Sequence, residues 1–148
     1  MADLYELVLA LDLRGLTPDE EAELRWHVGA GERPERLVFG TDANLEAWPL
    51  GDPNDPDCEW EKAEPEALFA ATGPAHRIGG ALVQRLEPRD NGWALTVRQE
   101  LHPDQFPALR SILERLGPRA ARDGFVGYLR FYENTDVTAL TVDNGQIT

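Results

Sequence analysis

The sequence predicts an α+β fold, a ferredoxin-like two-layer sandwich in which two main helices cover one face of a mainly antiparallel sheet. Two observations lead to this prediction. An aromatic residue opens an alternating apolar run, an amphipathic stretch follows, and a glycine lies 24 positions on, from Tyr5 to Gly29 and again from Trp93 to Gly117. Further apolar runs give the order strand, helix, strand, hairpin, helix, strand. The length of 148 residues fits a single domain, 1–148.

The first strand and helix are expected at the N-terminus. In residues 4–13 the odd positions are apolar and share one side of an extended chain. Thr17, Pro18 and Glu20 have the layout of a helix start, because the threonine can cap an amide, proline needs no amide proton and the glutamate can reach back. We expect a helix over 18–28 that ends at Gly29 in a left-handed conformation. A short strand is expected at 36–39.

Residues 41–74 form an acidic, proline-rich insert between the two units. Residues 41–66 hold nine carboxylates and one lysine, a net charge of −8 within a chain total of −13. Four prolines in residues 41–66 argue against regular structure, so the sequence predicts a long surface loop followed by a short helix at 65–71.

Two of the four tryptophans, Trp48 and Trp60, lie inside this polar insert. Each indole either anchors the insert on the sheet or offers a flat contact surface. Anchoring is the favoured interpretation, because a long loop in a compact domain must be pinned somewhere.

The second half of the chain is predicted to form a hairpin, a helix and further strands. Apolar runs at 77–86 and 93–101 flank Asn91-Gly92, which favours a tight hairpin. Helical spacing follows up to Leu116, with Asp104 as the expected cap. Alternation resumes at 125–132, and 137–148 is expected to form an edge strand and a frayed tail.

Two layers leave one sheet face uncovered, so a lid is expected from the insert, the tail or a second subunit in a homodimer.

The net charge of −13 disfavours nucleic acid and anionic membranes as partners, because phosphate groups would be repelled. The N-terminal segment resembles neither a signal peptide nor a membrane span. Cys58 is the only cysteine, which fits a reducing compartment, and we expect the protein in the cytoplasm.

Several chemistries find no support in the sequence. The only serine, Ser111, lies inside a predicted helix, and acidic neighbours suppress the thiolate of Cys58. No glycine-rich phosphate loop is present, and no cofactor is expected. The run from Asp55 to Glu66 has the spacing of a calcium loop, but Trp60 stands where the sharp turn needs glycine. No metal site is therefore predicted.

Three functional hypotheses follow. The leading one is a non-enzymatic protein-binding module whose insert contacts a basic partner. The residues expected to make this contact are Trp48, Trp60, Asp55, Asp57 and Glu59. The alternative is a small-molecule-binding enzyme or sensor with a pocket on the sheet face, lined by His102, Glu100 and Tyr128, in which His102 would be the general base. In the third, the sheet face serves only self-association.

Overall fold

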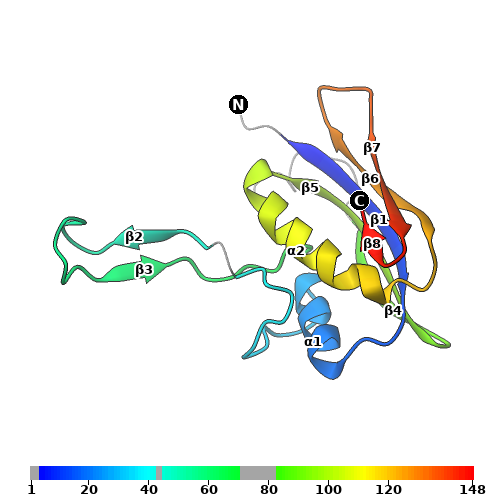
Figure 1. The fold of residues 1–148 in the computed structure, drawn as a ribbon, viewed down its shortest axis with the longest axis horizontal. Helices are drawn as coiled ribbons and strands as arrows, with labels where there is room; N and C mark the ends of the chain where they lie inside the picture. The colour runs from blue at the N-terminus through cyan, green and yellow to red at the C-terminus, as the bar shows by residue number, and fades with distance from the viewer. Residues whose placement is uncertain (1–3, 43–44, 71–82) are drawn as a thin grey trace.

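The computed structural model describes residues 4–42, 45–70 and 83–148, which contain a six-stranded antiparallel sheet and two α-helices (Figure 1). The strand order is β4-β5-β1-β6-β7-β8, and every neighbouring pair is antiparallel. The strands are β1 (Tyr5–Leu13), β4 (Val83–Arg89), β5 (Gly92–Leu101), β6 (Gly124–Phe131), β7 (Thr138–Asp143) and β8 (Gln146–Ile147). The helices are α1 (Pro18–His27) and α2 (Phe106–Leu116), with the short 3-10 turns η2 (Pro103–Gln105) and η3 (Gly117–Arg119) around α2. The predicted α+β class is confirmed.

The core lies between the sheet and the two helices. The odd positions of β1 from Leu7 to Leu13 are buried, as the alternation predicts. They pack with Leu24 of α1 and with Ile112 and Leu116 of α2, and Figure 1 shows both helices on the same side of the sheet. Complete burial of one such side chain contributes about 1.5–3 kcal/mol.

Helix α1 begins with the predicted capping box. The Thr17 hydroxyl accepts from the Glu20 amide at 3.2 Å, and the Glu20 carboxylate accepts from the Thr17 amide at 2.9 Å. Glu20 is buried and also binds Arg115 at 3.0 Å and Arg119 at 3.2 Å, so it ties the start of α1 to the end of α2. Burial alone would raise the pKa of Glu20, but these hydrogen bonds and charges outweigh it and lower the pKa. Gly29 has the expected positive φ of 77°.

The strand expected at 36–39 is wrong. The amides of Val38 and Phe39 both donate to the carboxylate of Glu23 on α1, the second at 3.1 Å. A segment whose amides are bound to a helix side chain cannot offer them to a neighbouring strand, so 36–39 remains irregular.

The helix expected at 65–71 is also wrong over residues 65–70; Ala71 lies outside the described residues. The Leu68 amide donates to His27 Nδ1 at 3.0 Å, and the Phe69 amide donates to the His27 carbonyl at 2.8 Å. Because Nδ1 accepts, the ring proton lies on Nε2, which donates to Glu23 at 2.9 Å. We call these six residues, Glu23, His27, Val38–Phe39 and Leu68–Phe69, the insert root.

The β4–β5 hairpin is confirmed, with Asp90 and Asn91 in the turn; the predicted residues 77–82 of its first strand lie outside the described part. The Asn-Gly pair was expected to supply the positive backbone angles of a tight turn. This expectation is wrong, because neither Asn91 nor Gly92 has a positive φ. Gly92 is needed because the Leu13 carbonyl occupies the space of a Cβ atom.

The frayed C-terminal tail is a wrong prediction as well. Asn144 and Gly145, with φ of 50° and 80°, form a tight turn, and β8 pairs back onto β7. Positive φ at both central residues is typical of a type I′ two-residue hairpin turn. Ile147 packs against the core, so the tail extends the sheet and does not cover its second face.

Candidate functional site

The insert contains a hairpin that the sequence did not predict. Strands β2 (Ala47–Pro49) and β3 (Trp60–Lys62) pair antiparallel, and Figure 1 shows them projecting away from the sheet. Two further hydrogen bonds extend the ladder, Leu50 amide to Glu59 carbonyl at 2.8 Å and Ala63 amide to Glu46 carbonyl at 2.7 Å. We call residues 47–62 the arm. It projects from the sheet and helices as a two-stranded ribbon and does not form the lid that was one of the three covers considered.

Trp48 and Trp60 do not anchor the insert, contrary to the favoured interpretation. Trp48 is 43 % exposed and Trp60 is 54 % exposed. The anchoring is done by the insert root, where Phe39, Leu68 and Phe69 are buried. Both indoles are therefore free to contact another molecule.

The two faces of the arm differ. Trp48 lies opposite Glu61, and its indole N–H donates to the Glu61 carboxylate at 3.1 Å. Alternation places Leu50, which is 59 % exposed, and Glu59 on the same face. Trp60 lies opposite Pro49 and so belongs to the other face. We call the face with Trp48, Leu50, Glu59 and Glu61 the acidic-apolar face.

The predicted binding residues Asp55 and Asp57 lie at the tip of the arm, where a run of turns joins the strands. Asp55 accepts from the Asp57 amide at 2.9 Å, and the neighbouring Asp52 accepts from the Asn54 amide at 2.9 Å. Cys58 is a free, half-buried thiol whose Sγ lies 3.3 Å from the Glu59 carbonyl. Among the described residues, no group of three or more histidine, cysteine, aspartate or glutamate side chains is arranged to hold a metal ion.

The second face of the sheet carries a polar cluster at its centre, where the sequence led us to expect a surface in need of a lid. Glu6 of β1 is only 4 % exposed. Arg98 of β5 donates to it at 3.0 Å, the Tyr128 hydroxyl of β6 donates at 3.0 Å, and Arg130 lies at 3.6 Å. The strand register explains the cluster, because Glu6 pairs with Arg130 while Arg98 and Tyr128 flank Val8, two residues further along.

The cluster fixes the protonation of its members. Burial alone would raise the pKa of Glu6, but the hydrogen bonds from Arg98 and Tyr128 and the charges of Arg98 and Arg130 outweigh it and lower the pKa. The hydrogen bond to Glu6 and then burial raise the pKa of Tyr128. Glu6 is therefore an ionised acceptor and Tyr128 a protonated donor, which is a structural arrangement rather than an acid–base pair.

Glu100 lies beside this cluster and is only 8 % exposed. The Tyr132 hydroxyl donates to one of its carboxylate oxygens at 3.2 Å, and the other oxygen, Oε2, is buried with no hydrogen-bond partner among the residues that the structure describes. Burial, followed by the charge of Glu100 and the hydrogen bond to it, raises the pKa of Tyr132 to about 12. A buried oxygen without a partner needs an explanation, and a ligand is one.

His102 does not join this group. Its Nδ1 accepts from the Asp104 amide at 3.2 Å and its own amide donates to Gln105 at 3.0 Å, so His102 caps η2 in the place expected for Asp104. Within the described part of the chain, no hydrogen bond or ion pair joins His102 to Glu100 or Tyr128. Two clefts formed by described residues, of about 770 and 290 Å³, are lined by none of these three.

The polar cluster was only partly visible in the sequence. The alternation of β6 correctly places Tyr128 and Arg130 on the face of the strand that is opposite to the face of Leu129. Glu6, which interrupts the apolar run of β1, was the available signal for its centre. The partners of Glu6 come from strands 92 to 124 positions away, and a single sequence does not show such a register.

No protein-family model matches this chain, and searches of curated proteins and of solved structures find no match either. No helix in the described part of the chain has the length and apolar character needed to span a bilayer. The function is therefore argued from the geometry of the arm and the sheet alone.

Proposed function

We propose that this chain is a non-enzymatic protein-binding module in which the arm docks onto a basic partner. The observation that carries the proposal is that Trp48 and Leu50, which are 43 % and 59 % exposed, belong to the arm, and the arm projects away from the sheet (Figure 1). Apolar side chains of this size on a projecting element are typical of an interaction site. The acidic-apolar face would be the centre of the contact.

Charge specifies the kind of partner. Glu59 and Glu61 lie on the strand opposite Trp48 and Leu50, so a complementary surface would set lysine or arginine side chains beside an apolar groove. Asp55 and Asp57 at the tip add to the long-range attraction, which speeds association more than it tightens binding. Tryptophan commonly contributes a large share of interface energy when it is desolvated in a pocket.

The experiment is a fluorescence-polarisation titration of a synthetic amphipathic peptide that bears lysine and leucine side chains. The double variant Trp48→Ser, Leu50→Ser should bind at least about tenfold more weakly than the unaltered chain. The matched control is Trp60→Ser, which removes a somewhat more exposed indole from the other face and should leave the affinity nearly unchanged. Binding should also weaken as salt is added.

Two results would contradict the proposal. One is equal binding by the control and the double variant, because then the acidic-apolar face is not the contact. The other is binding that is independent of ionic strength, because then charge does not select the partner.

A second candidate function is the binding of a small molecule on the sheet face, favoured by the buried Oε2 of Glu100. Its centre would be Glu100 and Tyr132, and His102 would have no part in it. Guanidinium and imidazole are suitable probes, since each can donate to a carboxylate. Their addition should shift the amide resonances around Glu100 in the unaltered chain but not in Glu100→Gln; identical shifts in both would remove this candidate.

The ferredoxin-like topology is also part of the proposal. Its support is the order β4-β5-β1-β6, in which β1 lies between β5 and β6, together with a helix after β1 and another after β5. Strands β2, β3, β7 and β8 would then be additions to that plan. An experimental structure in which β1 pairs directly with β4 would contradict it.

A further inference from the structure

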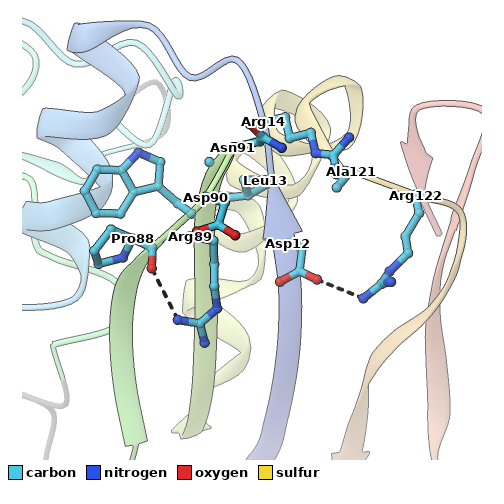
Figure 2. Close-up of a pocket in the computed structure, with 11 residues that line it drawn as sticks. Asp12, Leu13, Arg14, Pro88, Arg89, Asp90, Asn91, Ala121 and Arg122 are labelled. Atoms are coloured by element: carbon cyan, nitrogen blue, oxygen red, sulfur yellow. Dashed lines mark hydrogen bonds and ion pairs between the residues drawn. The ribbon is translucent and has the colours of Figure 1, made fainter.

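A cleft of about 770 Å³ lies at the end of the sheet where β1 leads towards α1 and β4 turns into β5 (Figure 2). Its walls come from three segments, 12–14, 88–93 and 121–122. None of these residues belongs to the arm or to the polar cluster around Glu6. The cleft is thus a separate feature of the molecule.

The walls are held by backbone hydrogen bonds. The Arg14 amide donates to the Arg119 carbonyl at 2.8 Å, and the Ala121 amide donates to the Asp12 carbonyl at 2.8 Å. Leu13 also pairs with Ala120. The segment after η3 is therefore fixed against the end of β1, and the side chains that line the cleft start from a rigid frame.

Three guanidinium groups line the cleft, those of Arg14, Arg89 and Arg122, against the carboxylates of Asp12 and Asp90. Acidic residues outnumber lysine and arginine by 27 to 14 in the whole chain, so this cleft reverses the balance found elsewhere. Figure 2 shows the three arginines coming from three different segments, with Asp12 between Arg89 and Arg122 in that view.

The arginines keep hydrogen-bonding capacity to spare. Asp12 binds Arg122 at 2.9 Å, while Arg89 lies 3.3 Å from Glu87 outside the lining. Arg14 forms no ion pair with any described residue. A guanidinium group has five N–H donors and one carboxylate occupies two of them at most, so each group can still bind an anion. Asp12 would orient Arg122 for that purpose.

The cleft also has an apolar wall, formed by Pro88 and Trp93. The Arg25 guanidinium lies over the Trp93 ring with its Cζ 4.8 Å from the ring centroid, which holds the indole from one side. A ligand that rests an organic body on this wall could place a charged group among the arginines.

We propose that this cleft binds a small organic anion through its phosphate or carboxylate group, held by Arg14, Arg89 and Arg122. Arginine matches the geometry of both oxyanions because it donates two parallel hydrogen bonds. In a chain of net charge −13, which repels anions over most of its surface, a local group of arginines directs an anion to one place.

The test is a titration of the ¹⁵N-labelled full chain with inorganic phosphate and, separately, with citrate, at constant ionic strength. Amide resonances of Arg14, Asn91 and Arg122 should shift and saturate. Saturation by phosphate indicates a phosphate-bearing ligand, and saturation by citrate alone indicates a carboxylate. Arg14→Gln should weaken binding about tenfold, the loss expected for charge-assisted hydrogen bonds.

The matched control is Arg110→Gln, which removes the same charge from an exposed site on α2. Its affinity should stay within about twofold of the unaltered chain. Should Arg14→Gln fail to fold, Arg122→Gln provides the same comparison from a side chain that is 80 % exposed. Equal weakening by the cleft variant and the control, or no shift with either anion, would overturn the proposal.

Discussion

The insert root and the arm are adjacent along the chain, because Val38–Phe39 precede the arm and Leu68–Phe69 follow it, yet they are built in opposite ways. At the root, Glu23 and His27 are fully buried and bind the amides of Val38, Phe39 and Leu68. Along the arm, indole and leucine side chains are exposed and the two strands form a sheet of their own. The comparison indicates that the root belongs to the folding unit while the arm is an appendage available for binding.

The largest expected effect is at the root. Glu23→Ala should lower the free energy of unfolding by about 3 kcal/mol or more, because it leaves the Val38 and Phe39 amides and the His27 N–H buried without an acceptor. The measurement is urea denaturation at neutral pH. The control is Glu21→Ala on the same helix, which removes only a surface pair with Arg25 at 3.2 Å and should cost about 0.3–0.5 kcal/mol. Equal losses in the two variants would mean that the root does not hold the insert.

Acid should lower the free energy of unfolding through carboxylates of the sheet and helices rather than through those of the arm. The pKa values of Glu6 and Glu20 are lowered in the folded chain from the ordinary 4.5, so their contribution is complete above that pH and is lost as the pH falls below it. Urea midpoints between pH 7 and pH 3 should therefore decline less in the double variant Glu6→Gln, Glu20→Gln. Replacement of Glu59 and Glu61 on the arm by glutamine should leave the decline as it is; a flattened profile in this control would contradict the comparison.

Raising the pH should lower the free energy of unfolding by a smaller amount, through the ionisation of Tyr132. Its pKa is raised from 10 to about 12, so the stability it contributes is complete below pH 10 and is lost as the pH rises through about 12. Tyr132→Phe should be less stable at neutral pH by about 1 kcal/mol, the usual value of one hydrogen bond, and should lose less on going to alkaline pH. An alkaline profile that is unchanged by the substitution would show that the hydrogen bond to Glu100 is not maintained.

The smallest expected effect is on the arm. Trp48→Ser with Leu50→Ser should change the free energy of unfolding by less than about 0.5 kcal/mol, because about half of each residue is already exposed to water. Thermal unfolding followed by far-ultraviolet circular dichroism measures it. A loss of several kcal/mol would show that the arm packs against the body in solution.

Local signals in the sequence were sufficient for much of the fold. Thr17, Pro18 and Glu20 specify the start of α1, and the alternation of β1 identifies its buried face, because both patterns depend on neighbouring residues. The strand at 36–39 was wrong because the Glu23 carboxylate, 15 residues earlier, takes up the amides of Val38 and Phe39. Hydrogen bonds between distant segments leave no periodic pattern.

The candidate sites were harder to predict for the same reason. The sequence points to the acidic insert and its two tryptophans as a candidate site, but the pairing of Trp48 with Glu61 and the opposite orientation of Trp60 depend on the hairpin register. The cleft combines Arg14, Arg89 and Arg122, which are far apart in sequence. Each resembles an ordinary surface arginine until the fold brings them together.

Removal of the arm tests the central claim most directly. Because the Ala63 amide is bonded to the Glu46 carbonyl, residues 47–62 can be replaced by Asn-Gly without moving the root. The shortened chain should unfold at the same urea concentration as the full chain and should lose binding of the lysine–leucine peptide. A markedly lower unfolding midpoint, or binding that survives the deletion, would contradict the division between a structural root and a binding arm.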